Sequence, residues 1–351
     1  MHAASSGGLD DSPSSFSDAT ATLLYGYSFQ NGTIYDRLDA KGLEWTVFMG
    51  DELPQVFAIH GMNEARLEGH FKGFDDFEKT VNDPGFSTSY IFIEPSYGNV
   101  LPLTPGDYTC GSSQHPLDDI TRGEKLIKKI YETIRNSPHW NNSLLLVTYD
   151  EHGGFYDHVA PPATVSPGDK ISDNNNNHYN FDFTQLGIRV PAVVVSPLIA
   201  RNTIDHTLYD HSSVLATVES MFGINPLTNR DGQANTFKHL LSLMNPRTDA
   251  ITGLPDPPDS GFQCAGDVED KHTASGSPSQ VSRGQVQRGP IEPTLRGWLH
   301  VAFLRRHQLT PPPDREALAR DFLKINDRLD ALNYMKEVAV SIQKLKRETS
   351  K

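Results

Sequence analysis

The sequence predicts an α/β fold in which helices flank a mostly parallel sheet. Short apolar runs, such as residues 90–93 and 144–147, are typical of strands that are buried on both faces. The segments between them, such as residues 118–138, carry apolar residues at helical spacing instead. Strands that alternate with helices in this way favour a sheet covered by helices. Ligands of such proteins gather at the carboxyl ends of the strands.

The first expected helix begins near Ile34 and carries Leu38 on the same face. Gly42 should end this helix, because glycine readily takes the left-handed conformation that follows a helix. Residues 45–49 then form a strand. The run "STSYIFIEPSY" contains a second strand, which Pro95 closes.

A longer helix is expected before Pro138, where five apolar residues recur at helical spacing: Ile120, Leu126, Ile127, Ile130 and Ile134. Two further strands follow in "SLLLVTYD" and "VPAVVVSPLIA". The run "DHSSVLATVESMFGI" then predicts a helix with Ser212 or Asp210 at its N-cap, Glu219 inside it and Gly223 at its end.

The chain is acidic. Its 351 residues carry 44 acidic and 31 basic side chains, which give a formal net charge of -13. An acidic chain repels nucleic acid, and no basic stripe or RNA-binding motif offsets that repulsion. We therefore expect no nucleic-acid partner. The sequence has no run of about 18 apolar residues, so we expect no membrane-spanning helix.

The sequence leaves the location of the protein open. Cys110 and Cys264 could pair, but two cysteines in a chain of this length do not make a disulfide framework. Sequons at Asn31 and Asn141 are compatible with secretion. The opening residues "MHAASSGGLDD" lack the features of a signal peptide, although such a signal could be missing. A secreted or vacuolar protein and a cytosolic, membrane-peripheral protein both fit these observations.

The composition changes along the chain and predicts three regions. Residues 1–250 contain the expected strands and helices, whereas residues 251–293 are rich in Pro, Gly and Ser and are typical of a linker. Residues 294–351 predict a helical tail. Its run "LRGWLHVAFLRRH" sets apolar residues against arginines and could lie on a membrane surface. Packing of the apolar stripe onto the folded domain is the commoner arrangement, and we favour it.

The run "TYDEHGGFYDH" concentrates reactive side chains at the end of a strand. Asp150 and Glu151 are adjacent, and close carboxylates raise each other's pKa unless they are paired or bind a cation. In an isolated pair, one carboxylate would face solvent and the other would cap a turn. Gly153-Gly154 allows another backbone to come close, and His158 adds an imidazole nearby. Oxygen ligands beside an imidazole suit a divalent metal ion.

Two further histidines lie at positions that suit an anion. His115 precedes the longer helix, and His211 lies at the start of a helix, where free N–H groups and the helix dipole favour phosphate. Either could equally be an ordinary surface or capping histidine. Together with the carboxylates they indicate metal-assisted hydrolysis of an anionic ester. Their spacing does not exclude a Ca²⁺-stabilised binding module.

The long motif "LLLVTYDEHGGFYDHVAPP" resembles the signature of a phosphoesterase family. That family contains the non-specific and phosphatidylcholine-preferring phospholipases C and related acid phosphatases. Five other segments occur in the order of the family: "TIYDRLDAKGLEWTVF", "YIFIEPSYGN", "QHPLDDITRGEKLIKKIYETIR", "FDFTQLGIRVPAVVVSPLIAR" and "YDHSSVLATVESMFGI". The resemblance covers roughly residues 1–240 and assigns the catalytic domain to residues 1–250.

The resemblance implies an alkaline-phosphatase-like α/β/α sandwich. Family members use a Ser or Thr nucleophile that forms a phospho-enzyme, which water then hydrolyses. Asp150 and Glu151 match the acidic pair that binds a divalent metal ion, whose identity stays open. The family's histidine roles would fall on the imidazoles of this chain, which would orient the phosphate oxygens and protonate the leaving alkoxide. These imidazoles are His115, His158 and His211, and less firmly His152.

The resemblance also assigns the nucleophile. The opening "MHAASSGG" matches the family's small-residue turn and places Ser5 at the nucleophile position, with Ser6 as the alternative. Family members begin upstream with a strand ending in "ENRSFDH"-type residues, which complete the metal site, and this sequence has no match to them. We therefore expect an amino-terminally truncated chain that is poorly folded or weakly active by itself.

The predicted function is the hydrolysis of phosphate esters. The resemblance favours a phospholipase C that cleaves phospholipid headgroups through a serine phospho-enzyme. An acid phosphomonoesterase is the alternative within the same chemistry. A truncated remnant that binds metal or lipid without turnover is a third interpretation. The expected partner is a phospholipid or another phosphate-ester substrate, with peripheral membrane contact as a further expectation.

Overall fold

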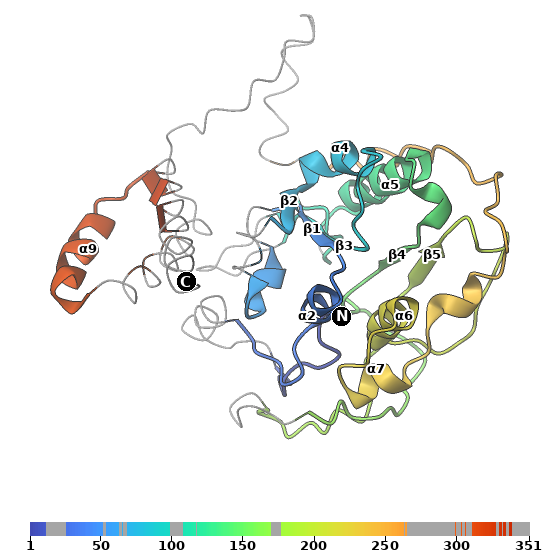
Figure 1. Cartoon of the computed structure of the whole chain (residues 1–351), viewed down its shortest axis with the longest axis horizontal. Helices are drawn as coiled ribbons and strands as arrows, with labels where there is room; N and C mark the ends of the chain where they lie inside the picture. The colour runs from blue at the N-terminus through green and yellow to red at the C-terminus, as the bar shows by residue number, and fades with distance from the viewer. Residues whose placement is uncertain are drawn as a thin grey trace, which may run out of the picture.

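A computed structural model gives the fold of most of the chain. It describes residues 1–11, 26–51, 54–62, 65, 69–98, 108–116, 118–169, 177–262, 264, 299, 303, 306, 311–327, 330, 331, 333, 334, 337 and 338. Helices lie on both sides of the strands (Figure 1). No helix among these residues is long and apolar enough to cross a membrane.

Five strands and six α-helices carry the fold of the described residues. The strands are β1 (Trp45–Met49), β2 (Phe71–Gly73), β3 (Tyr90–Glu94), β4 (Leu145–Thr148) and β5 (Ala192–Val195). The α-helices are α2 (Ile34–Ala40), α4 (Phe77–Val81), α5 (Thr121–Asn136), α6 (Ser212–Phe222), α7 (Asn229–Gln233) and α9 (Arg315–Phe322). Short 3₁₀ turns occupy Gln55–Ala58, Phe74–Asp76, Trp140–Asn142, Phe237–Leu240 and Pro312–Asp314.

Most of the elements expected from the sequence are confirmed, with small shifts at two helix starts. Ile120 is the N-cap of α5 and is exposed rather than buried in the helix. The N-cap of α6 is His211, not Ser212 or Asp210, although the Asp210 carboxylate still accepts a hydrogen bond from the Ser212 N–H at 2.7 Å. The sequence did not predict β2, α4 and α7, which are only three to five residues long.

Strand β1 is the centre of a parallel three-stranded sheet. It pairs with β2 on one side and β3 on the other, with Val47 opposite both Phe71 and Phe92. Successive side chains of β1 point to opposite faces. Val47 belongs to the core that contains residues of α2 and α6, whereas Phe48 packs with residues of α4 and α5. Because both faces are covered, β1 is buried almost completely, as its apolar sequence predicts.

Strands β4 and β5 form a separate antiparallel pair. Leu145 lies opposite Val195, and Thr148 lies opposite Ala192. The expected mostly parallel arrangement holds for β1 to β3, whereas β4 and β5 are antiparallel. A parallel connection normally needs a crossover helix, and the described residues between these strands, 149–169 and 177–191, contain none. Val193 in β5 remains 58% exposed.

The region predicted as a linker begins as a segment attached to α5. The Tyr131 hydroxyl donates to the Ile251 carbonyl at 2.6 Å, and the Leu254 N–H donates to the Glu132 carboxylate at 2.7 Å. A disulfide joins Cys110 to Cys264 across 154 residues of sequence. Residues 265–293, the rest of the predicted linker, lie outside the described residues.

The described part of the tail has an apolar cluster of its own. Leu299 is buried with Phe322, and the ring of Phe303 lies 4.4 Å from that of Phe322. The apolar stripe predicted in "LRGWLHVAFLRRH" thus packs within the tail where it is described. Its other members, among them Leu295, Trp298 and Ala302, lie outside the described residues.

Two buried carboxyl groups lie on α6 and α7, Glu219 and Asp231. Asp231 accepts hydrogen bonds from Leu227 N–H, Thr228 N–H and Thr228 Oγ1, each at 2.7 Å. Glu219 is 3% exposed, and neither of its carboxyl oxygens has a hydrogen-bond partner among the described side chains. Burial, followed by the proximity of the Asp231 carboxyl group, raises the pKa of Glu219 to about 9. Glu219 is therefore neutral at pH 7.

The protonated Glu219 should make the stability of the fold pH-dependent. Because its pKa rises from 4.5 to about 9 on folding, its contribution is fully present below pH 4.5 and is lost as the pH rises through 9. The loss has a slope of at most about 1.4 kcal/mol per pH unit. The Glu219→Gln variant should lose less stability between pH 5 and pH 9 in urea unfolding. An identical pH dependence in both proteins would contradict this.

The disulfide should contribute measurably to stability. Cys110→Ser should lower the free energy of unfolding by about 2–5 kcal/mol, because the bridge closes a long loop in the unfolded chain. Urea unfolding with and without reductant measures this. Reductant should destabilise the wild-type protein to the level of the variant and leave the variant unchanged. A wild-type protein that is insensitive to reductant would show that the bridge contributes nothing.

Candidate active site

The acidic pair forms a tight turn immediately after β4. The Asp150 carboxylate accepts the Glu151 N–H at 3.0 Å, and the Glu151 carboxylate accepts the Gly153 N–H at 2.7 Å. Both side chains are exposed. Each carboxylate therefore uses one oxygen to hold its own turn and leaves the other available to solvent or a ligand. The turn presents two negative charges at the carboxyl end of β4.

Gly153 lets a second loop approach the acidic turn. Its φ of +67° is in the left-handed region, and a Cβ built there would lie 2.6 Å from Pro116. The Tyr149 hydroxyl also donates to the Gln114 side chain in the same loop. His115 lies between Gln114 and Pro116, so these contacts place its backbone beside the acidic turn. The close approach that the glycine pair predicts is thus present.

His211 reaches the same turn from another element. It is the N-cap of α6, and its Nε2 lies 2.9 Å from the Tyr149 carbonyl oxygen, one residue before Asp150. Because a carbonyl oxygen accepts, Nε2 carries the proton in this contact. The start of α6 therefore lies against the end of β4. Among the predicted histidines, His115 and His211 are the two that the structure brings to the acidic turn.

The sequence reasoning missed two carboxylates at the ends of β1 and β3. Asp51 follows β1 and accepts hydrogen bonds from the Ser96 hydroxyl and the Tyr97 N–H, each at 2.7 Å. Glu94 ends β3, is 3% exposed, and accepts the N–H groups of Gln55 and Val56. An acidic residue at the end of an apolar run, before a proline, was the available signal for Glu94.

These carboxylates and Asp150 share one electrostatic environment. Burial raises the pKa of Tyr97 well above its usual range, and the charges of Glu94, Asp150 and Asp51 raise it further. Burial also raises the pKa of Glu94 to about 7, against the lowering effect of its backbone hydrogen bonds. Glu94 therefore changes charge near neutral pH. Tyr97 lies among three carboxylates drawn from the ends of β1, β3 and β4.

The start of the chain runs along this site. The nitrogen of Met1 is buried within electrostatic range of Asp150 and Asp210. Four residues further on, the Ser5 hydroxyl donates to the Asp169 carboxylate at 2.6 Å and accepts the Gly7 N–H at 2.9 Å. Ala4, just before Ser5, has a φ of +52°. No contact joins Ser5 to the acidic turn among the described residues.

Three other predicted site residues, Ser6, His152 and His158, differ in their contacts with the acidic turn. The Ser6 hydroxyl is buried and has no hydrogen-bond partner among the described residues. His152 closes the acidic turn through a contact of 3.2 Å from its Nδ1 to the Phe155 carbonyl oxygen. The side chain of His158 is 82% exposed, and its nearest charged partner is Asp157 at 3.5 Å. The structure therefore does not bring His158 into contact with Asp150 or Glu151.

The carboxylates present meet only part of the requirement for a metal ion. Adjacent carboxylate oxygens are hard donors, and Asp150 and Glu151 match the preference of Mg²⁺ or Ca²⁺. Among the residues that the structure describes, however, no group of three or more His, Cys, Asp or Glu side chains could hold an ion. The pair is thus chemically suitable but incomplete, and we derive no catalytic step from a metal.

An ion pair fixes the carboxyl end of residues 148–158, the segment with the sequence "TYDEHGGFYDH". The guanidinium of Arg189 donates to both carboxylate oxygens of Asp157, at 2.7 and 2.8 Å. The hydrogen bond from Arg189 is the main reason that the pKa of Asp157 lies well below its usual range. The pair connects the segment after β4 to the segment before β5. It is intact at neutral pH and weakens as acid protonates Asp157.

Removing this ion pair should loosen the acidic turn. In the Arg189→Leu variant we expect faster hydrogen exchange of the backbone amides in residues 150–158, measured by mass spectrometry. Arg201→Leu is the matched control, because Arg201 is also exposed and lies 3.8 Å from Asp249, away from this turn. Equal exchange of residues 150–158 in both variants would show that the ion pair does not hold the turn.

Comparisons with known proteins agree with the motif in this segment. The model of the Phosphoesterase family matches residues 1–225. Non-specific phospholipase C3 of Arabidopsis thaliana is 34% identical over 268 residues, which are 74% of this chain and 48% of that protein. Non-specific phospholipase C6 of the same plant is 35% identical over 237 residues, 64% of this chain and 44% of that protein.

A bacterial relative shows the same partial coverage. Phospholipase C B of Mycobacterium tuberculosis is 27% identical over 259 residues, which are 63% of this chain and 47% of that protein. The chain spans about half the length of the curated relatives that it matches. The family match extends from the first residue past α6 and includes all the predicted site residues. On this match, which covers more than half of the sequence, the chain belongs to the phosphoesterase family.

Proposed function

We propose that this chain is the catalytic part of a phospholipase C, a hydrolase that cleaves the phosphate ester of a phospholipid headgroup. One structural observation carries the proposal. The turn of Asp150 and Glu151, the loop of His115 and the start of α6 at His211 converge at the carboxyl end of β4. The names of the plant and mycobacterial relatives support phospholipase C within this family. The family's alkaline-phosphatase-like α/β/α sandwich is part of the same proposal.

The two convergent histidines take the acid and anion-binding roles. At the start of α6 the helix dipole favours a phosphate oxygen, and His211 holds its imidazole there through the bond from its Nε2 to the Tyr149 carbonyl. His115 is the second candidate to orient phosphate oxygens or to protonate the leaving alkoxide. His158, which is largely exposed, would need a shift of its segment to take part. His152 already holds the turn and supports it from within.

Ser5 is the proposed nucleophile. Its Oγ attacks phosphorus, the bond from phosphorus to the diacylglycerol oxygen breaks, and that alkoxide takes up a proton. Water later breaks the bond from Ser5 to phosphorus and releases the phosphorylated headgroup alcohol. The 2.6 Å hydrogen bond to Asp169 supports this role, because that carboxylate can accept the hydroxyl proton. In a phospholipase C the bond that breaks is the one to the diacylglycerol oxygen.

A divalent metal ion is proposed at Asp150 and Glu151. Such an ion, when bound, would supply positive charge beside the phosphate. The residues themselves hold the turn through their own backbone N–H groups. Binding of Mn²⁺, followed by calorimetry, tests the assignment without an activity assay. Loss of binding in Asp150→Asn is the expected result.

Loss of the acidic turn or of His211 should abolish most of the activity. With phosphatidylcholine as substrate, Asp150→Asn and His211→Asn should each lower kcat/KM roughly a hundredfold or more. Asp182→Asn is the matched control, because Asp182 is an exposed acid that caps a turn at Thr184. Hydrolysis of p-nitrophenyl phosphate, assayed in parallel, distinguishes a phosphomonoesterase. Unchanged hydrolysis of both substrates by the Asp150 and His211 variants would refute the proposed site.

The phospho-enzyme can be tested directly. After an acid quench during turnover of phosphatidylcholine, mass spectrometry should find phosphocholine on Ser5 in the wild-type protein and none in Ser5→Ala. Ser6→Ala should still trap the intermediate. Phosphocholine on Ser6 or on another residue would reassign the nucleophile while leaving hydrolysis through a phospho-enzyme in place. No covalent adduct in an active protein would exclude this mechanism.

A further inference from the structure

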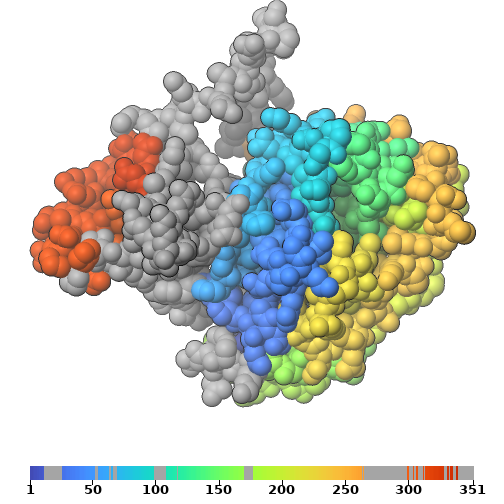
Figure 2. Space-filling model, in the orientation of Figure 1, coloured from blue at the N-terminus to red at the C-terminus, as the bar shows by residue number. Residues whose placement is uncertain are grey.

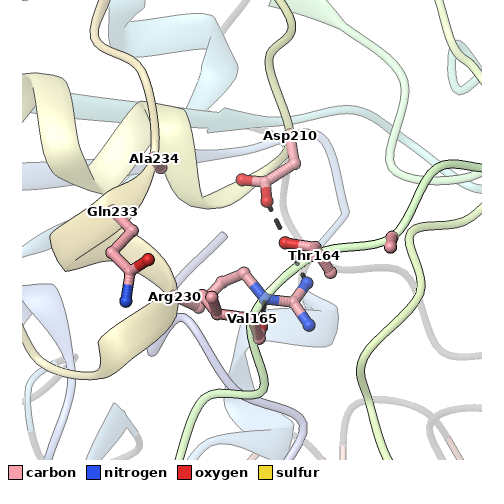
Figure 3. A pocket seen from close by; sticks show the side chains of 7 residues that line it. Thr164, Val165, Asp210, Arg230, Gln233 and Ala234 are labelled. Atoms are coloured by element: carbon pink, nitrogen blue, oxygen red, sulfur yellow. Dashed lines mark hydrogen bonds and ion pairs between the residues drawn. The ribbon is translucent and has the colours of Figure 1, made fainter.

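A cavity with polar and apolar lining residues adjoins the candidate active site. It has a volume of about 350 Å³, a size within the range of small-molecule sites. Its walls come from residues 163–165, which follow the acidic turn, from Asp210 and from the region of α7 (Figure 3). The lining residues are Ala163, Thr164, Val165, Asp210, Arg230, Gln233 and Ala234. Asp210 immediately precedes His211, so the cavity and the site share the start of α6.

Arg230 is held rigidly in the wall of the cavity. Its Nε donates to the Val165 carbonyl at 2.6 Å, and its Nη2 donates to the Phe183 carbonyl at 2.5 Å. Nη1 lies 4.0 Å from the Asp210 carboxylate, too far for a hydrogen bond. The Nη1 hydrogens therefore have no hydrogen-bond partner within the described residues. A planar guanidinium that is fixed in this way presents preorganised donors.

Two uncharged side chains complete the polar lining. Thr164 is held through its backbone, whose N–H donates to the Thr184 carbonyl at 2.8 Å. Its hydroxyl and the Gln233 amide form no hydrogen bond within the described part of the chain. In Figure 3 the side chains of Asp210, Thr164 and Arg230 lie close to one another, with Gln233 reaching out from α7 beside them. The cavity thus offers both donors and acceptors that remain unused.

The charges and side-chain types of the residues that line the cavity indicate which kind of ligand it can bind. Asp210 and Arg230 carry opposite charges, so their sum favours neither a cation nor an anion, and Asp210 repels a second phosphate. A quaternary ammonium group binds best against aromatic faces, and none of the lining residues is aromatic. Hydroxyl groups both donate and accept. A neutral ligand with several hydroxyl groups matches carboxylate, guanidinium, amide and hydroxyl partners together.

We propose that this cavity binds the headgroup alcohol of the substrate and that it selects headgroups with several hydroxyl groups, such as inositol or glycerol. This inference rests on the proposed phospholipase function for its role in catalysis, but the binding itself does not. Asp210 accepts hydroxyl hydrogens, and Arg230 Nη1 and the Gln233 amide donate to hydroxyl oxygens. The phosphate would then lie on the side of Asp210 that carries His211.

The first experiment measures binding without turnover. Ligand-observed NMR titrations of the 351-residue protein use myo-inositol and choline as probes. Wild-type protein should bind myo-inositol more tightly than choline, and the double variant Thr164→Val, Gln233→Ala should weaken myo-inositol binding about tenfold through two lost hydrogen bonds. Gln185→Ala is the matched control, because this exposed glutamine lies in the neighbouring segment and does not line the cavity. Equal binding of both probes, or an unaffected double variant, would overturn the proposal.

The second experiment measures selectivity in catalysis. The ratio of kcat/KM for phosphatidylinositol to that for phosphatidylcholine, in mixed micelles, should fall about tenfold in the double variant. It should not change in Gln185→Ala. An unchanged ratio in an active double variant would overturn the cavity as the headgroup site and leave the phospholipase function intact. Binding of myo-inositol by a protein that hydrolyses neither lipid would support the cavity and refute the phospholipase function.

Discussion

The packing of β1 is the constraint on which the rest of the structure depends. Trp45 and Val47 point to one face of the sheet and Phe48 to the other, and all three are almost completely buried. Because of this alternation, α2 and α6 pack on one face of the sheet and α4 and α5 pack on the other. Figure 2 shows the surfaces of α2 (blue) and α6 (yellow) side by side. Because β1 and β3 are parallel neighbours, their ends deliver Asp51 and Glu94 to one edge.

Buried acids serve two different purposes in this protein. Glu94 lies at the sheet edge, where burial brings its pKa to about 7 while backbone N–H groups favour its charged form. The charge of Glu94, which lies beside Asp51 and Tyr97, therefore responds to small changes of pH near neutrality. Glu219 lies between α6 and α7 with no donor for its oxygens, and it stays neutral. The difference follows from their neighbours. Two backbone N–H groups lower the pKa of Glu94, whereas the Asp231 carboxyl group raises that of Glu219 further.

The position of α7 follows from a small number of polar contacts. Its capping box at Thr228 begins the helix, Asp231 fixes the preceding turn, and Arg230 reaches across to two backbone carbonyls. Arg230 thus has a structural role and a free donor face at the same time. Arg230 and Gln233 of this short helix line the cavity beside it.

The sequence by itself determined the local elements and the acidic turn. Helical spacing in residues 121–136, the apolar runs of β1, β3, β4 and β5, and Gly223 at the end of α6 depend on near neighbours, so they were readable without a fold. Gly153 predicted a close approach for the same reason. Only the tertiary structure decided that β4 and β5 are antiparallel, that Cys110 pairs with Cys264, and that Ser5 meets Asp169. These contacts join residues far apart in the chain, and no local periodicity encodes which distant partners meet.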